Sequence, residues 1–384
     1  MSTTLLNFII GPAGAWSILG LNGILLYILI SQISKIVLSE ISAKSEKSAL
    51  KYYRIAPIFL FIGGTMPFLW DNWISYVILV PLFLGGFVGA YWTSFHGIRK
   101  AIAPKYENND VGLARFQFYE VLSTIFAASL VVILNHIDLN QYSSLLGSLF
   151  ALIALILPSD FNPNLTFIGS STSDTKSDNV ILGILTTGTF GILQIVIPWS
   201  MRIVALNQGG GTNLLGVMVA SATFIGWMIS KGSKKKKEKL KNDFSKSNKF
   251  NERNWKSGYL FCSFGILIMI GSLLLYQNII FLIGYLTCIL GLNGILRPLE
   301  IKYASELLTH PSGKNIGLRE RKKFQTQFRF LSGYILIYAV LLLLSFIDKL
   351  TINILLVPAL TFSLLVCILN LYLNPRLQSF IKVL

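Results

Sequence analysis

Long apolar blocks separated by polar connections dominate the sequence. Most blocks run for about 18 to 25 residues, the length with which an α-helix crosses the hydrocarbon core of a bilayer. They are continuously apolar and lack the alternation of a barrel strand, so the pattern predicts helices. We therefore expect an all-α membrane protein with about eleven transmembrane helices. The predicted spans are 13–35, 55–70, 73–95, 116–134, 143–158, 180–201, 213–230, 258–275, 279–296, 326–346 and 351–373.

Lysine and arginine gather in every second connection between these spans. On the opposite side, only Arg202 and Lys349 are basic. Positively charged loops stay in the cytoplasm, so the pattern places the basic loops and the C-terminus inside and the N-terminus outside. We expect an integral protein of a prokaryotic plasma membrane. Four connections hold five, four, eleven and seven basic residues respectively: 32–54, 96–115, 231–257 and 297–323.

Composition removes several other classes of protein. The chain has 384 residues, of which 53% are hydrophobic and 13% charged, whereas soluble proteins are about 25% charged. This excludes a soluble enzyme with a lone anchor, a secreted disulfide scaffold and a disordered protein. The net charge of +16 does not indicate nucleic acid, because the run Lys234–Lys237 has no interleaved aromatic residues. That run is expected to set topology and to contact anionic lipid heads.

The residues that bind metals are few and scattered. The three cysteines, Cys262, Cys288 and Cys367, all lie in apolar blocks without metal-ligand spacing. We expect them to act as small apolar side chains in helix packing. The three histidines form no cluster, so neither a metal nor another cofactor is expected.

A weak internal repeat relates the two halves of the chain. Val111-Gly112-Leu113-Ala114-Arg115 aligns with Ile316-Gly317-Leu318-Arg319, an offset of 205 residues. Each stretch follows a basic loop and precedes a span. The repeat predicts an N-terminal bundle at 1–158 with about five spans and a C-terminal bundle at 180–384 with about six. A cytoplasmic linker at 159–179 joins them, and span 180–201 has no counterpart in the first half.

This layout resembles the major facilitator superfamily, whose halves are parallel helical repeats with short outer turns and long basic inner loops. Leu84–Pro104 is similar to the fourth helix of the family running into its cytoplasmic loop, and Val111–Leu130 to the small-residue-rich fifth helix. The resemblance implies two pseudo-symmetric bundles around a shared substrate site. The chain departs from the family in two places. Residues 34–54 replace the usual Gly-x-x-x-Asp-Arg loop, and the first helix of the family is missing. Residues 5–15 are apolar but too short for a span, and we expect them at the membrane interface.

Polar and aromatic residues inside the spans are candidates for substrate binding, since polar groups in membrane proteins face the bundle interior or a cavity. Span 180–201 combines polar and aromatic side chains with Gly188, Gly191 and Pro198, which permit bending. The alternative is that its threonines bond their own backbone, while Trp199 and Arg202 are interfacial anchors. The substrate-binding candidates are Gln194, Trp199, Thr187, Asn22, Trp92 and Asn293.

Charged residues at the inner ends of the spans are candidates for gating or ion coupling. Glu120 is the only acid inside a predicted span. His96 and Arg99 end the third span, and Arg297 and Glu300 end the ninth in the equivalent place. The alternatives are a surface ion pair for Glu120 and snorkelling to the lipid head groups for the basic residues. Gly85 and Gly89 form a GxxxG step, which favours close helix packing.

These features predict a secondary active transporter that moves a small solute by alternating access, and no enzyme. No GxxxxGK[ST] motif is present, so energy would come from a proton or Na⁺ gradient or from the gradient of the solute itself. One alternative is a membrane assembly or scaffold protein that kept the fold, with the missing helix as its main support. The other is a membrane enzyme acting on a lipid-linked substrate. Such enzymes need clustered acids to hold Mg²⁺, and here only Asp174 and Asp178 have that spacing.

Overall fold

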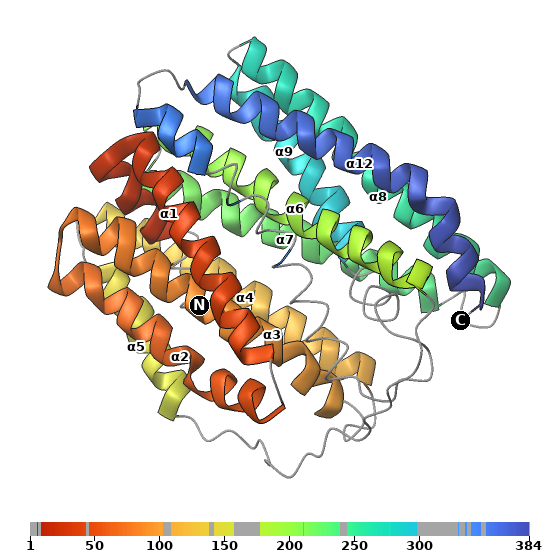
Figure 1. The fold of residues 1–384 in the computed structure, drawn as a ribbon, viewed down its shortest axis with the longest axis horizontal. Coiled ribbons are helices and arrows are strands. Elements are labelled where there is room, and N and C mark those ends of the chain that lie inside the picture. The colour runs from red at the N-terminus through yellow and green to blue at the C-terminus, as the bar shows by residue number, and fades with distance from the viewer. Residues whose placement is uncertain are drawn as a thin grey trace. The chain divides into compact units, whose positions relative to one another are not determined.

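The structure is a computed structural model in which every described element is helical (Figure 1). The chain forms two compact units. Unit 1 comprises Met1–Thr172, Ala205–Ala220 and Gly313–Leu350, and unit 2 comprises Ser173–Val204, Ser221–Ser312 and Thr351–Leu384. The structure describes residues 6, 9–43, 46–102, 109–137, 142–156, 177–209, 211–238, 244–275, 277–297, 329, 335, 339–346 and 351–383.

Ten of the predicted spans fall on described helices, most of which extend beyond the apolar stretch, whereas most of the predicted span 326–346 lies outside the described residues. Seven described segments are long and apolar enough to cross a membrane, and Leu122–His136 and Tyr142–Ile156 are shorter apolar helices. The all-α membrane fold predicted from the sequence is therefore confirmed. The proposed division at 159–179 stays a prediction, because residues 157–176 lie outside the described part. The elements are α1 (Gly11–Ala43), α2 (Glu46–Leu69), η2 (Ser75–Leu79), α3 (Val80–Ile102), α4 (Asn109–His136), α5 (Tyr142–Ile156), α6 (Ser177–Asn207), α7 (Gly211–Glu238), α8 (Phe244–Leu274), α9 (Asn278–Ile289), η4 (Leu290–Leu296) and α12 (Ile352–Val383).

Helix α1 reverses direction at Gly20. This residue has φ 57° and ψ −134°, a conformation that residues with a Cβ rarely adopt. A Cβ on Gly23 would lie 2.1 Å from the carbonyl oxygen of Ala15, and one on Gly11 would lie 2.6 Å from the Tyr27 hydroxyl. In a straight helix, residues eight positions apart are about 12 Å apart. The chain before Gly20 therefore runs back along the chain after it.

The folded-back segment is buried in unit 1. Leu6 is only 1% exposed, and Ile9 and Ile10 are buried too. The Leu6 side chain fills the space in front of Gly64 on α2 and Gly147 on α5, where a Cβ would lie 2.7 and 2.8 Å from it. The expectation that residues 5–15 lie at the membrane interface is therefore wrong. The expectation was based on the length of the apolar stretch, which is too short to cross a membrane. Because the chain reverses at Gly20, this short helix packs inside the bundle instead.

Close packing of α1 on α3 holds the inner part of unit 1 together. A Cβ on Gly85 would lie 2.2 Å from the Ser31 carbonyl oxygen, and one on Gly89 would lie 2.3 Å from that of Lys35. Small residues let helix backbones approach each other in a membrane, so the packing role predicted for this GxxxG step is confirmed. The Ser34 hydroxyl also donates a hydrogen bond to the Leu82 carbonyl oxygen at 2.6 Å, across the same contact.

In unit 2, α8 packs against α9, η4 and α12. The Cys288 thiol donates to the Cys262 carbonyl oxygen at 3.5 Å, and the Cys262 thiol donates to the Cys288 carbonyl oxygen at 3.6 Å. Each sulfur lies where the facing helix carries a glycine, Gly265 for Cys288 and Gly291 for Cys262. Cys367 is also buried and in contact with Cys262. The packing role predicted for the cysteines is confirmed.

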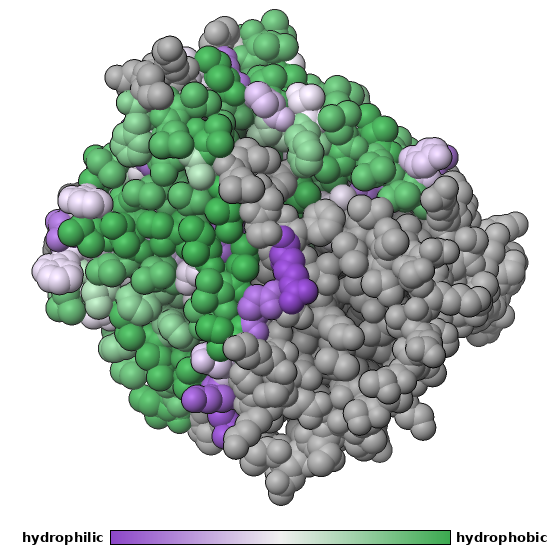
Figure 2. Space-filling model, in the orientation of Figure 1, coloured by the Kyte–Doolittle hydropathy of each residue, from purple (hydrophilic) through white to green (hydrophobic). Residues whose placement is uncertain are grey.

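The surface of the described helices is largely apolar (Figure 2). Among the most exposed large side chains are Phe126 on α4, Phe264 on α8 and Leu365 on α12. Meanwhile Ser39, Thr93 and Asn370 are fully buried. Apolar residues outside and polar residues inside are what a bilayer solvent requires, which agrees with an integral membrane protein.

Candidate functional site

The depth of each polar group along α1 follows from its geometry. Ser17, Ile18 and Leu19 are exposed at the reversal, which marks one end of the span. An α-helix rises 1.5 Å per residue, so residues 32, 35 and 40 lie roughly 18, 22 and 30 Å from Gly20 along the axis. The hydrocarbon core is about 30 Å thick. Gln32 and Lys35 therefore lie within the length of helix that crosses a membrane, and Glu40 lies at the end of that length.

A polar pair lies inside this span. The Lys35 ammonium donates a hydrogen bond to Gln32 Oε1 at 3.0 Å, and Gln32 is 2% exposed. Sequence reasoning placed Lys35 at the end of its span and counted it among the loop cations. Helix α1 ends only at Ala43, so Lys35 does not lie at its end. The helical pattern of the sequence continues through Ile41, and this pattern could have placed Lys35 within the helix.

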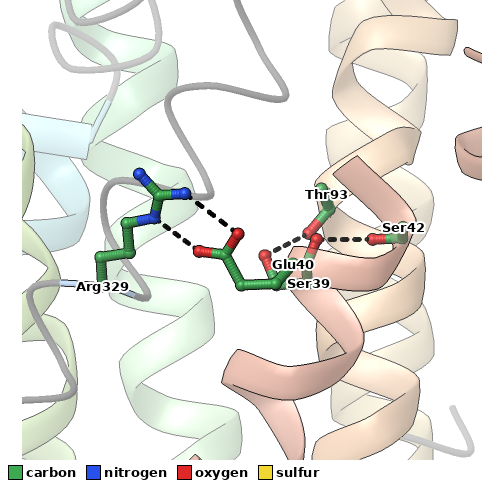
Figure 3. Close-up of polar contacts among 5 residues, drawn as sticks. All are labelled: Ser39, Glu40, Ser42, Thr93 and Arg329. Carbon is green, nitrogen blue, oxygen red and sulfur yellow. Dashed lines mark hydrogen bonds and ion pairs between the residues drawn. The ribbon is translucent and has the colours of Figure 1, made fainter. Parts of the chain in front are cut away.

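An ion pair links distant parts of the sequence near the C-terminal end of α1 (Figure 3). Arg329 Nε donates to Glu40 Oε1 at 2.5 Å, and its terminal nitrogen donates to Glu40 Oε2 at 3.1 Å. The contact is bidentate, the strongest arrangement of these two groups. Glu40 belongs to the first predicted half and Arg329 to the second, and both lie in unit 1. Neither was a sequence candidate, because each was counted only as a loop or end charge.

The contact between α1 and α3 beside Glu40 sets the direction of its side chain. The Thr93 hydroxyl lies 3.0 Å from Ser39 Oγ, and the Ser42 hydroxyl donates to the Ser39 carbonyl oxygen at 3.1 Å. These contacts fix the Ser39 face of α1 against α3. Neighbouring helix residues are turned by about 100°, so Glu40 points away from α3. Figure 3 shows Arg329 reaching it from that other side.

Trp92 belongs to an aromatic cluster in unit 1. Its ring stands edge-on to Tyr91, with centroids 5.3 Å apart, and edge-on to Phe95 at 5.5 Å. Tyr91 in turn stacks on Phe87 at 5.0 Å and on Tyr53 of α2 at 5.2 Å. Such pairs stabilise helix packing beyond their buried area. The cluster gives Trp92 a packing role, and its predicted role in substrate binding stays a prediction.

Span α6 turns its polar residues into unit 2. Trp199 is 7% exposed and Arg202 is 8% exposed. The Arg202 guanidinium lies over the Trp199 ring, 4.6 Å from its centroid. An interfacial anchor would be exposed to lipid head groups and water. The burial of Trp199 and Arg202 therefore argues against the interpretation as interfacial anchors and favours side chains that face inward.

One further polar contact in unit 2 joins α6 and α12. Asn370 Nδ2 on α12 donates to Thr189 Oγ1 at 2.9 Å and to the Val366 carbonyl oxygen at 2.8 Å. This buried contact ties α6 to α12, and sequence reasoning missed Asn370. Asn293 is half-buried beside Gly226, and Gln194 is half-buried on α6. In unit 1, Asn22 is half-buried just after the reversal.

Most of the predicted gate residues lie where side chains are not described. His96 and Arg99 on α3 and Glu120 on α4 have described backbone only, as does Thr187 on α6. Glu300 lies outside the described residues. Arg297 is half-buried at the end of η4. Among the described residues, no group of three His, Cys, Asp or Glu side chains is placed to hold a metal ion.

Comparison with known proteins finds similar folds. Neither models of protein families nor curated protein sequences match the chain. The structure is similar to that of a D-xylose-proton symporter, with a TM-score of 0.65 and 11% identity, over 97% of this chain and 95% of that one.

Two further solved structures share the arrangement. For the E. coli fucose:proton symporter FucP the TM-score is 0.53 and the identity 13%, over 97% of this chain and 95% of that one. For a bacterial homologue of the iron transporter ferroportin they are 0.51 and 15%, over 98% of both chains. At these identities the likeness is one of fold. The chain therefore has the fold of the major facilitator superfamily, an all-α fold of membrane transporters.

Proposed function

We propose that this protein is a secondary active transporter that carries a small solute across a prokaryotic plasma membrane by alternating access. The fold supports this proposal, because proteins that share it move solutes by rocking two bundles about a central site. The buried polar groups support it too. Gln32, Lys35, Arg202 and Trp199 lie within the spans, where polar groups are costly and are usually functional.

The observation that carries the mechanism is the contact between Glu40 and Arg329. It joins residues of the two predicted halves at the inner edge of the membrane. The Arg329 side chain is 64% exposed and that of Glu40 is 35% exposed. A pair this accessible contributes only about 0.2–1 kcal/mol. A contact of that strength holds the cytoplasmic side closed and still opens in every transport cycle.

The coupling ion is proposed from weaker support. Two solved proteins of similar fold are proton symporters, which favours a proton over Na⁺. Glu120 stays the proposed coupling residue, with Arg297, His96, Arg99 and Glu300 as proposed gate residues. Gln194, Thr187, Asn22, Asn293, Trp92 and Trp199 stay proposed substrate contacts.

The scaffold alternative loses its main support. It depended on the absence of an apolar element before the first long span. The folded-back residues before Gly20 supply such an element, with Leu6 packed against Gly64 of α2 and Gly147 of α5. No described feature favours the scaffold over the transporter.

Uptake into liposomes tests the proposal. Purified protein is reconstituted, a proton or Na⁺ gradient is imposed, and accumulation of labelled sugars, amino acids and organic acids is compared with empty liposomes. We expect accumulation of one solute class, driven by one of the two gradients. Glu120→Gln and Arg297→Ala should reduce it without changing membrane insertion, whereas Lys256→Gln, which removes an exposed cation, should not. Absence of uptake or exchange for every solute would contradict the proposal.

A further inference from the structure

Lys35 carries an ionisable group within the length of helix that crosses a membrane. It lies seven residues before the end of the apolar segment Gly11–Ser42, or about 10 Å along the axis. The reversal at Gly20, at the other end of this part of α1, is about 22 Å away. A lysine in this position ordinarily extends toward the nearer head groups, which here lie beyond Ser42.

The Lys35 side chain is engaged with the preceding turn of the helix instead. Its ammonium donates a hydrogen bond at 3.0 Å to Oε1 of Gln32. Gln32 is 2% exposed, so this acceptor lies inside unit 1. The backbone of Lys35 is held as well, because a Cβ on Gly89 of α3 would lie 2.3 Å from its carbonyl oxygen. The amine is therefore kept within the bundle, where ionisable groups are costly and usually functional.

The other ionisable groups around α1 differ from Lys35. Helix α1 packs mainly against α3, η2 and α2. Lys51 and Arg54 are exposed on α2, and tyrosine ordinarily titrates only near pH 10. Lys35 is therefore the member of this set that holds an amine within the bundle. The ionisable side chains described on these four helices are Tyr27, Lys35 and Glu40 on α1, Tyr91 on α3, Tyr76 on η2 and Lys51, Tyr52, Tyr53 and Arg54 on α2.

Lysine is suited to carrying a proton in such a place. A buried lysine can release its proton and serve as a base, whereas arginine stays charged. The ammonium has three donors, and the neutral amine that remains has two donors and one acceptor. The Gln32 side chain offers both a carbonyl acceptor and an amide donor. It can therefore hydrogen-bond either form of Lys35, and Lys35 keeps its partners in both forms.

We propose that Lys35 is a further coupling residue, which binds and releases one proton in each transport cycle with Gln32 as its hydrogen-bond partner. The inference rests on the proposed transport function and names a group that couples a proton to it. One proton from outside binds the neutral amine of Lys35 and forms the ammonium. The ammonium later loses one proton to the cytoplasm, so the amine is regenerated. Solute and proton cross together, and the carrier returns empty with the neutral amine.

The test separates the exchange of solute from its accumulation. Full-length protein in proteoliposomes is given labelled sugars, amino acids and organic acids. Exchange is measured at equal pH on both sides, and accumulation with an interior more alkaline than the medium and the membrane potential clamped. The variants are Lys35→Arg and Lys35→Gln. Lys256→Arg and Lys256→Gln are the matched controls, because they make the same changes at an exposed position on α8.

We expect the wild type and both Lys256 variants to accumulate one solute class about tenfold across about one pH unit, the ratio that one proton per solute supplies. Lys35→Arg keeps the charge but does not release its proton, so it should exchange the solute without accumulating it. Lys35→Gln has no proton to release, and the same result is expected. If one of the two Lys35 variants does not fold, as judged by its thermal unfolding midpoint in detergent, the other decides.

The two proposals fail in different ways. Accumulation by a folded Lys35 variant equal to that of the wild type would overturn the coupling role and leave transport standing. So would exchange by the wild type without accumulation in a proton gradient. Loss of exchange in folded Lys35→Arg, or unfolding of both Lys35 variants, would also overturn the coupling role, because it would show a role in binding or packing. Absence of exchange in the wild type would overturn transport and the coupling role together.

Discussion

The backbone of Gly23 packs directly against the carbonyl oxygen of Ala15. A Cβ at Gly23 would lie 2.1 Å from that oxygen, closer than any ordinary contact. The contact exists because Gly20, between them, takes a positive φ that reverses the chain. It places Leu6, Ile9 and Ile10 inside unit 1, where Leu6 fills the space in front of Gly64 on α2 and Gly147 on α5.

Gly23→Ala is therefore expected to destabilise the protein. The new methyl group has to displace backbone and not a flexible side chain, and overpacking of this kind costs about 1–3 kcal/mol. The measurement is the midpoint of thermal unfolding in detergent. Gly271→Ala is the control, since nothing lies within 4 Å of its Cβ position. It should be neutral or slightly stabilising, and an equal loss in both variants would contradict the folded-back segment.

Adjacent glycines on α3 give a second matched pair. Gly85→Ala brings a Cβ to 2.2 Å from the Ser31 carbonyl oxygen, whereas the nearest atom for Gly86→Ala is the Ser34 hydroxyl at 3.3 Å. Only the first substitution should force α1 and α3 apart. We expect a lower unfolding midpoint for Gly85→Ala and little change for Gly86→Ala. The reverse order would show that α1 packs on α3 through a different face.

All three cysteines should be protected from modification in the folded protein. Cys262, Cys288 and Cys367 have no exposed surface, and buried thiols in apolar surroundings are inert. A small membrane-permeant maleimide followed by intact mass measurement should show no label before denaturation in detergent and three labels after it. Rapid labelling of any cysteine in the folded protein would contradict the packing of α8, α9 and α12.

The contact of Glu40 with Arg329 should be electrostatic and weak. Glu40→Gln and Arg329→Gln should each change the unfolding free energy by less than about 1 kcal/mol, with a coupling energy of about 0.2–1 kcal/mol in the double-mutant cycle. Exposed pairs are screened, so the coupling should fall as salt is raised. The exchange of the two charges, Glu40→Arg with Arg329→Glu, should restore the uptake that is lost when either reversal alone places two like charges together. A coupling that does not respond to salt would contradict an exposed ion pair.

The sequence is informative where a single physical rule decides the structure. Bilayer thickness sets the length of an apolar block, so the spans around Asn278–Leu296 and Ile352–Leu373 could be predicted closely. The small side chains of Gly85 and Gly89 likewise predicted helix contact. What could not be predicted depends on one backbone angle or on tertiary neighbours. The helix before the reversal at Gly20 is shorter than a membrane span, so the length of its apolar stretch does not reveal that it is part of the bundle.

The candidate site shows the same limit. Trp199 was identified because an aromatic residue in a polar span is conspicuous, but the burial of Arg202 depends on tertiary neighbours, which the sequence does not place. Glu40 and Arg329 are far apart in sequence, and each alone looks like one of many loop charges. Asn370 becomes notable only because Thr189 lies opposite it.

The central proposal is that the contact between Glu40 and Arg329 opens and closes during transport. Cysteines introduced as Glu40→Cys and Arg329→Cys, joined by a short bis-methanethiosulfonate reagent, test it directly, because the native thiols are buried. We predict that cross-linked protein in proteoliposomes stops solute exchange and that a reductant restores it, while each single variant treated alike keeps exchanging. Undiminished exchange by fully cross-linked protein would contradict the account.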